Sequence, residues 1–171
     1  MNKVLYLQKL CNKYGDFYIT NSFRGEDEEL HWFKHRSIIE CWESEKGLWF
    51  LSKATHRTCL KCEIVLDMDE DISLLRLNRI CDSLEKKYNF QYKAYSTGSK
   101  GYHIHILVPE MIHETYDKRK KMRLSLIGKT TGWDMDGLKI SEKSMIAIEN
   151  IPHWKTGNIK TLVREYGKSW I

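Results

Sequence analysis

The stretch between residues 63 and 108 constrains the fold most, because its hydrophobic pattern changes period twice. Glu63–Asp67 (EIVLD) is a short apolar run that is typical of a buried strand. Apolar residues then recur at helical spacing and predict an amphipathic helix over about 72–88. Alternating residues predict strands at Phe90–Ser96 and Tyr102–Val108, joined by a glycine-containing turn at Thr97–Gly101.

The strand at Tyr102–Val108 is predicted to have one apolar and one polar face. Successive side chains of a strand point to opposite faces, so Ile104 and Ile106 share one face. His103 and His105 share the other face. We expect His105 to make a satisfied contact in the core, which is the usual place of a histidine in such a strand.

The flanking regions predict further short elements. Leu5–Cys11 indicates a first helix, and a later helix is expected over about 112–126, after Pro109. Strands are predicted at Phe17–Phe23, Leu30–Phe33, Leu48–Ser52, Leu138–Ile140, Met145–Ile148 and Ile159–Val163. This order favours an α+β fold with a mixed β-sheet, helices on one side, and an extra N-terminal lobe of about 60 residues.

Composition limits the class of protein. Among 171 residues, 42% are hydrophobic and 12% aromatic, which is enough for a core and excludes overall disorder. The net charge of +5 suits a polyanionic partner. Five scattered cysteines do not suggest a disulfide framework, and no apolar run approaches the ~20 residues of a membrane helix. We therefore expect a cytoplasmic protein in a reducing compartment, with no membrane partner and no signal peptide.

Asp67 and Asp69 are the first candidates for chemistry. Residues two apart in a strand point to the same face, so their carboxylates form a compact negative site. Such a site suits Mg²⁺ or Mn²⁺, and paired carboxylates can bridge two metal ions ~3.5–4 Å apart. The alternative is an acidic turn in which Asp71 or Ser73 caps the following helix.

Two further segments could bind phosphate. In the glycine turn, backbone N–H groups together with Lys100 and His103 could grip a triphosphate, although an ordinary hairpin turn would look the same. Later, Asp134-x-Asp136 offers a third carboxylate. His153 and Lys155 would add positive charge, unless these loops carry ordinary surface charge.

Taken together, the order of these segments resembles the archaeo-eukaryotic primase superfamily, which includes the primase small catalytic subunit and primase-polymerases. The family's hydrophobic-D-x-D motif is matched by Val65–Asp69, and its S-G-x-x-G-x-H motif by Thr97–His103, with Thr in place of Ser. An aspartate followed by S-x-H-x-K-T-G is matched by Ile151–Gly157. Upstream, Phe33–Ile38 is similar to R-H-x-S-F, and Trp49–Ala54 is similar to an aromatic-rich Y-x-S-x-A segment.

The resemblance implies one primase-type catalytic domain over residues 1–171. An RRM-like catalytic half would cover about 61–171, a small N-terminal α/β lobe about 1–60, and a cleft would lie between them. Asp67, Asp69 and Asp136 would hold two Mg²⁺ or Mn²⁺ ions, with Asp134 as the other candidate for the third ligand. The implied nucleotide-binding residues are Arg36 (or Lys34), Thr97, Ser99, Lys100, His103, His153 and Lys155.

The resemblance also implies partners. These are nucleoside triphosphates, a single-stranded or primed DNA template, and a separate large subunit or helicase. The basic run Lys118–Lys121 could contact template phosphates or form a solvated surface. Zinc is not expected, because the family's zinc knuckle has no counterpart between the first two motifs and His56-x2-Cys59-x2-Cys62 lacks a fourth ligand.

Two other functions fit part of the pattern. His103-x-His105 is similar to the His-hydrophobe-His motif of rolling-circle nickases, in which both histidines bind one metal ion and Tyr116 would attack the DNA phosphate. That interpretation leaves the D-x-D and H-x-K-T-G segments unexplained. The non-enzymatic alternative is a primase-like module that only binds nucleic acid or other subunits.

Overall fold

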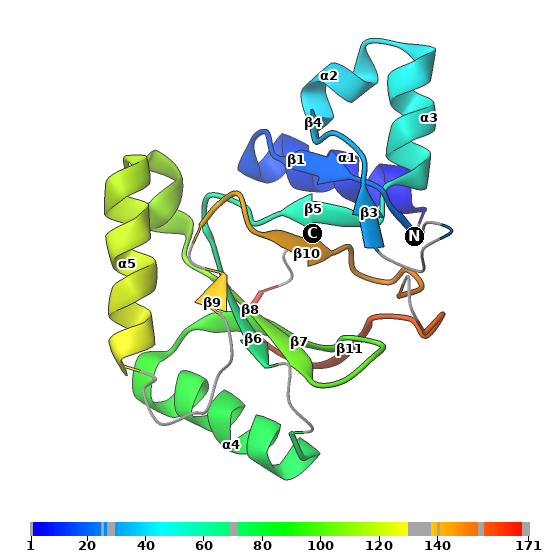
Figure 1. Ribbon diagram of the computed structural model, residues 1–171. Coiled ribbons are helices and arrows are strands. Elements are labelled where there is room, and N and C mark those ends of the chain that lie inside the picture. Colours follow the sequence, from blue (N-terminus) through cyan, green and yellow to red (C-terminus); the bar gives the residue numbers. More distant parts are fainter. Residues whose placement is uncertain are drawn as a thin grey trace.

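The computed structural model describes residues 2–24, 26, 30–68, 72–129, 138–139, 141–153 and 156–168. Within these residues the chain forms an α+β fold with five α-helices, two antiparallel sheets and a two-stranded ribbon. The helices are α1 (Lys3–Tyr14), α2 (Ile38–Trp42), α3 (Glu45–Lys53), α4 (Leu74–Ser83) and α5 (Tyr116–Lys129). In Figure 1, α1, α2 and α3 gather in one region, whereas α4 and α5 lie on the opposite side of the molecule.

The first sheet combines strands from the N-terminal and the C-terminal parts of the sequence. Its order is β10-β5-β1-β4, formed by β1 (Tyr18–Thr20), β4 (Arg36–Ser37), β5 (His56–Thr58) and β10 (Met145–Ala147). Ile146 of β10 lies opposite Arg57 of β5, and the two strands run side by side in Figure 1. The C-terminal third therefore supplies one edge of a sheet that is otherwise N-terminal. A separate ribbon pairs β2 (Ser22–Arg24) with β3 (Leu30–Trp32).

The second sheet carries most of the predicted motifs. Its order is β11-β7-β8-β6-β9, formed by β6 (Glu63–Met68), β7 (Gln91–Ser96), β8 (Tyr102–Leu107), β9 (Leu138–Lys139) and β11 (Thr161–Tyr166). The register of β6 and β8 places Asp67 opposite His103 and Val65 opposite His105. The first two motifs are therefore neighbours across two central strands.

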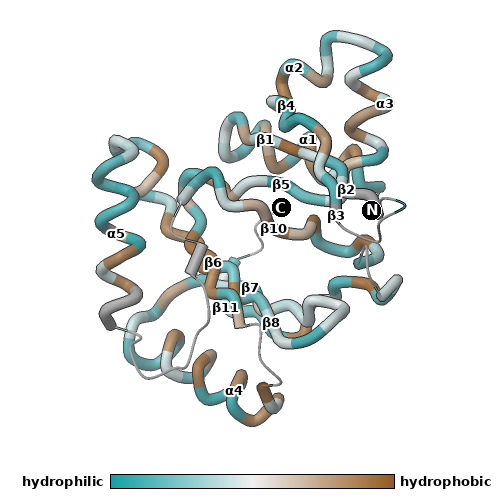
Figure 2. Tube along the Cα trace, in the orientation of Figure 1, coloured by the Kyte–Doolittle hydropathy of each residue, from teal (hydrophilic) through white to brown (hydrophobic). Residues whose placement is uncertain are grey.

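The apolar face of the second sheet packs against two helices. Ile64, Leu66 and Met68 of β6 are buried in one cluster with Leu77 of α4 and Leu126 of α5. Hydrophobic and hydrophilic segments alternate along α4 in Figure 2, as expected for a helix with one buried face. Because strand side chains alternate, the remaining residues of β6 and β8 point away from these helices.

The central prediction is confirmed in its main elements. The helix expected over about 72–88 is α4, capped by Ser73 and continued by the π-helical turn η1 (Leu84–Tyr88). The strands at Phe90–Ser96 and Tyr102–Val108 are β7 and β8. The helix expected over about 112–126 begins at Tyr116, since Pro109–His113 forms the 3₁₀ turn η2.

The strand predicted at Leu48–Ser52 is wrong, because this segment lies inside helix α3. Ser44 caps the helix by accepting a hydrogen bond from the Gly47 backbone N–H. Gly47, Phe50 and Leu51 are buried at helical spacing, whereas Trp49 is 62% exposed. A four-residue apolar run is compatible with a strand or a helix. Here the Ser44 cap and the spacing of the buried residues favour the helix.

The expected mixed sheet is also wrong, since every strand pair in the described residues is antiparallel. β6 and β7 run in the same direction, but β8 lies between them, so they do not pair. The strand predicted at Phe17–Phe23 is interrupted at Asn21 and forms β1 and β2.

Two observations concern the expected compartment. No helix in the described part of the chain is long and apolar enough to cross a membrane. The cysteines are free thiols and buried, at Cys11, Cys41, Cys59, Cys62 and Cys81.

Candidate functional site

A cavity of about 530 Å³ is lined by residues of both sheets. Six of its lining residues were predicted from the sequence as site residues: Asp67, Thr97, Ser99, Lys100, His103 and His153. The other lining residues come from β3, β5 and β10: Trp32, His56, Met145, Ile146 and Ala147. The six predicted residues, which span the sequence from Asp67 to His153, therefore share one cavity.

Asp67 and His103 line this cavity and lie against each other. Asp67 is 3% exposed and His103 is 8% exposed, and His103 Nε2 lies 3.0 Å from Asp67 Oδ1. A carboxylate facing a cavity is the hard oxygen ligand that Mg²⁺ and Mn²⁺ prefer, so Asp67 fits the predicted role. The other predicted metal ligands, Asp69 and Asp136, lie outside the described residues, as do Asp134 and Lys155.

The glycine turn and the H-x-K-T-G segment meet at the rim of the cavity. Thr97 Oγ1 donates a hydrogen bond to the Lys100 carbonyl at 2.8 Å, which closes the turn. Gly98 adopts φ +78°, and a Cβ at this position would approach the Asn158 carbonyl oxygen to 2.6 Å. Thr156 Oγ1 donates to the Gly98 carbonyl at 2.5 Å. A glycine is therefore required where the two predicted phosphate-binding segments touch.

The cavity lining also has an aromatic part, formed by Trp32 and His56. Trp32 is 44% exposed, and its ring meets His56 edge-on with 4.6 Å between ring centroids. His56 Nδ1 lies 2.9 Å from Thr55 Oγ1, a contact that orients the imidazole. Cys59 and Cys62, the other residues of the partial zinc pattern, are buried in two different hydrophobic clusters.

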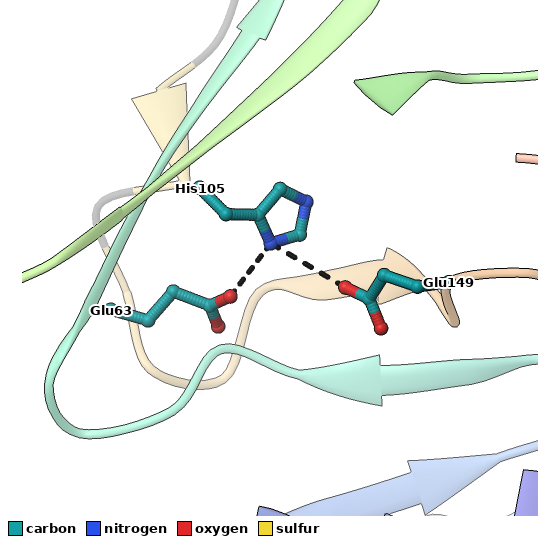
Figure 3. A group of neighbouring side chains, drawn as sticks. All are labelled: Glu63, His105 and Glu149. Carbon is teal, nitrogen blue, oxygen red and sulfur yellow. Dashed lines mark hydrogen bonds and ion pairs between the residues drawn. The ribbon is translucent and has the colours of Figure 1, made fainter. Parts of the chain in front are cut away.

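Five charged or titratable side chains are buried behind the cavity, and we call them the buried ion cluster: Arg57, Glu63, His105, Glu149 and Lys160. None is more than 2% exposed. Arg57 binds both carboxylates, with Nη1 2.8 Å from Glu63 and Nη2 2.7 Å from Glu149. His105 Nδ1 faces the same two carboxylates, at 2.7 Å from Glu63 and 3.5 Å from Glu149 (Figure 3). The expected core contact of His105 is thus confirmed.

Charge compensation decides the protonation states in this cluster. Burial alone would raise the pKa of Glu149, but Arg57 and Lys160 outweigh it and lower the pKa to about 2. Burial opposes a low pKa of Glu63 as well, and Arg57 nevertheless holds it well below its usual range. Burial, assisted by the charge of Lys160, lowers the pKa of His105 to about 4. Burial lowers the pKa of Lys160 to about 8, so near neutral pH the cluster contains two carboxylates, two cations and a neutral imidazole.

The same cluster offers ligands for a metal ion. One ligand atom each from Glu63, His105 and Glu149 lies within 4.8 Å of the others, so this group could hold a metal ion. Arg57 and Lys160 already place two positive charges against its carboxylates. A divalent cation bound by this group would have to displace these charges.

The low pKa of His105 makes stability depend on pH. Between pH 6.5 and about 4 the unfolded state protonates this histidine and the folded state does not. The free energy of unfolding should therefore fall as the pH is lowered, by up to about 1.4 kcal/mol per pH unit. His105→Asn, which retains a donor toward Glu63, should flatten this dependence in urea unfolding, whereas substituting the exposed His35 in the same way should not. Equal pH dependence in the wild type and His105→Asn would contradict the assignment.

Not every predicted residue reaches the cavity. Arg36 is absent from its lining, and its guanidinium instead lies over the Phe50 ring at 5.0 Å from the centroid. Arg119, in the basic run of α5, is buried in an ion pair with Glu142. Lys118 pairs with Glu114 at 2.6 Å. Lys120 and Lys121, like Lys118, are exposed positive charges of that run.

The buried ion cluster was largely missed by sequence reasoning. Glu63 could have been found, because it lies on the same strand face as Val65 and Asp67. Glu149 and Lys160 give no such signal. Lys160 directly precedes β11 but contacts residues 55 and 57 positions earlier, on β8. Contacts of this kind depend on how the two sheets stack.

Comparison of the chain with known protein families, with curated proteins and with solved structures found no match. The functional assignment therefore depends on the residues and geometry of the cavity.

Proposed function

We propose that the chain is a nucleotidyltransferase of the primase or primase-polymerase type, which binds a nucleoside triphosphate in the cavity between its two sheets. The observation that carries the proposal is that the residues of three separately predicted motifs line one cavity: Asp67 from the first, Thr97, Ser99, Lys100 and His103 from the second, and His153 from the third. Each motif alone is common. The register of β6 and β8 brings the first two together, and the approach of His153 adds the third to the same cavity.

The chemistry of the rim suits a polyphosphate. Lys100 supplies a compact positive charge, and the hydroxyl of Ser99 is an added donor beside it. His153 lies beside the same turn, since a Cβ at Gly98 would approach the Cβ of His153 to 3.3 Å. The aromatic wall formed by Trp32 and His56 offers an apolar surface to the remainder of the nucleotide.

Asp67 would hold the metal ions together with Asp69 and Asp136. When bound, these ions would lower the pKa of the attacking hydroxyl and neutralise charge on the triphosphate. The chain's own contribution is to bind the phosphates through the turn and to keep Asp67 oriented through its contact with His103.

The order of elements supports the finer proposal of an RRM-like catalytic half. Along the chain, β6, α4, β7, β8, α5 and β9 follow a β-α-β-β-α-β order in one antiparallel sheet with its helices on a common face. The first and third of these strands, β6 and β8, are adjacent and carry Asp67 and His103. In this proposal, the cleft between the catalytic half and the N-terminal lobe corresponds to the cavity, whose lining includes residues of the first sheet.

The rolling-circle nickase is the weaker assignment. It needs one metal ion shared by His103 and His105. Instead, the ammonium of Lys160 lies 3.2 Å from His103 Nδ1 and 3.0 Å from His105 Nε2. A cation of the protein itself therefore occupies the position between the two rings.

We propose single-stranded or primed DNA as the template and a separate large subunit or helicase as a further partner. The exposed Lys120 and Lys121 are available for phosphate contacts on the template. The net charge of +5 is consistent with such a polyanionic partner.

A binding measurement tests whether the glycine turn at Thr97–Gly101 binds the triphosphate. Lys100→Ala should weaken binding of a nucleoside triphosphate by about tenfold, as measured by calorimetry with Mg²⁺ present, because it removes a charge-assisted hydrogen bond worth roughly 1.5–3 kcal/mol. The matched control is Lys120→Ala, which removes an equally exposed charge from α5 and should leave the affinity unchanged. Equal affinity of the wild type and Lys100→Ala for the triphosphate would show that the glycine turn does not bind it.

A further inference from the structure

Lys160 connects the buried ion cluster to the cavity. Its side chain is fully buried, and its ammonium makes three short polar contacts. Nζ lies 2.9 Å from the Ala147 carbonyl oxygen, 3.2 Å from His103 Nδ1 and 3.0 Å from His105 Nε2. One side chain thus contacts β10 of the first sheet and two residues of β8 in the second.

These contacts determine which nitrogen of each histidine carries the proton. A lysine ammonium has three N–H donors and no acceptor, so every group in contact with it must accept. His103 Nδ1 is therefore unprotonated, and the ring proton is on Nε2, the atom that lies 3.0 Å from Asp67 Oδ1. By the same reasoning His105 carries its proton on Nδ1 and donates it to Glu63 Oε1 at 2.7 Å.

We propose that Lys160 is a positioning residue, which holds His103 in the tautomer with its proton on Nε2, the ring nitrogen that lies 3.0 Å from Asp67 Oδ1 in the cavity lining. In the opposite tautomer a neutral imidazole would turn a lone pair toward the carboxylate and toward any phosphate oxygen in the cavity, which is repulsive. Lys160 thus makes an uncharged histidine a hydrogen-bond donor for anionic groups. The consequence for nucleotide binding rests on the proposed function, whereas the tautomer itself does not.

The position of the ammonium is fixed from several sides. Nζ lies 5.1 Å from the centroid of the Tyr95 ring and 3.7 Å from Glu149 Oε1. These contacts add to the Ala147 carbonyl and hold the charge between the two imidazoles. Because a buried and fully satisfied polar group has few alternative positions, its three donors select one arrangement of the two rings.

Ring-nitrogen NMR of histidine-labelled wild-type protein tests the tautomer directly. Near neutral pH we expect His103 to carry its proton on Nε2 and His105 on Nδ1, because the chemical shifts of the two ring nitrogens distinguish these forms. A proton on Nδ1 of His103 in the folded wild type would overturn the proposal. This measurement needs neither metal nor nucleotide.

A charge-balanced variant tests the role of Lys160. Lys160→Met alone leaves the carboxylates of the cluster in excess, so it is combined with Glu149→Gln. The double variant should show both tautomers of His103 and a Michaelis constant for the nucleotide at least about tenfold higher, with a smaller change in the turnover number. Glu149→Gln alone is the matched control and should retain the single tautomer.

The possible outcomes separate the two proposals. A single Nε2–H tautomer in the folded double variant would show that Lys160 does not fix the ring, and would overturn the inference. If the wild type has the expected tautomers but incorporates no nucleotide, the proposed function fails and the tautomer assignment stands. If the double variant does not fold, the wild-type spectrum still decides the assignment.

Discussion

Asp67→Asn is expected to lower the rate of nucleotide incorporation by about a thousandfold while the protein remains folded. Removing a ligand that supports several kcal/mol of transition-state stabilisation has an effect of this order. Folding should survive, because asparagine has the same shape as aspartate and keeps an oxygen that can lie against His103 Nε2. Primer extension under single-turnover conditions measures the rate, and thermal melting reports the fold.

The control for this substitution is Asp117→Asn. Asp117 is an exposed carboxylate in the first turn of α5 and lies outside the cavity lining. It should incorporate nucleotides at the wild-type rate. Near-normal incorporation by Asp67→Asn would remove the carboxylate from the catalytic assignment, and a large loss of melting temperature would indicate that Asp67 has a structural role instead.

Arg57→Met is expected to lower the free energy of unfolding by about 3–5 kcal/mol, which is the cost of breaking a buried ion pair by removing one partner. Arg57 is fully buried and binds both Glu63 and Glu149, so its loss leaves two carboxylates with insufficient compensation. Urea unfolding measures the difference. Failure to fold at all would be the extreme of the same effect.

Lys118→Met is the matched comparison for Arg57→Met. Lys118 forms an exposed pair with Glu114 on the surface of α5, and pairs of that kind contribute little to stability. We expect almost no change in the urea midpoint for this variant. If Arg57→Met were equally harmless, the cluster would not be an important element of the fold, and the charge balance inferred for it would be incorrect.

The central part of the second sheet could be predicted from the sequence because its signals are local. The run Glu63–Asp67, the helical spacing that follows and the alternation in Tyr102–Val108 each specify one element with one buried face. The glycines of Thr97–Gly101 predicted the turn. The structure shows why Gly98 is needed there, because a Cβ at this position would collide with the Asn158 carbonyl oxygen.

The remainder of the site depends on long-range packing that no local pattern records. Arg57 contacts Glu149 across 92 positions, and Lys160 reaches His103 across 57. Both contacts require that β10 returns to pair with β5. Lys160 then bridges the Ala147 carbonyl of β10 and the histidines of β8. At Leu48–Ser52 the local signal itself was ambiguous, since a short apolar run fits a strand or a helix.

The measurement that tests the central claim most directly is extension of a primed single-stranded DNA template by the wild-type protein. Each nucleotide set is supplied in turn with Mg²⁺ or Mn²⁺, and matched reactions omit the metal or the nucleotide. We predict incorporation that follows the template sequence, requires the metal and releases pyrophosphate, with no cleavage when nucleotide is omitted. The account would be contradicted by the absence of incorporation under every condition, or by metal-dependent DNA cleavage without nucleotide that forms a covalent adduct with Tyr116.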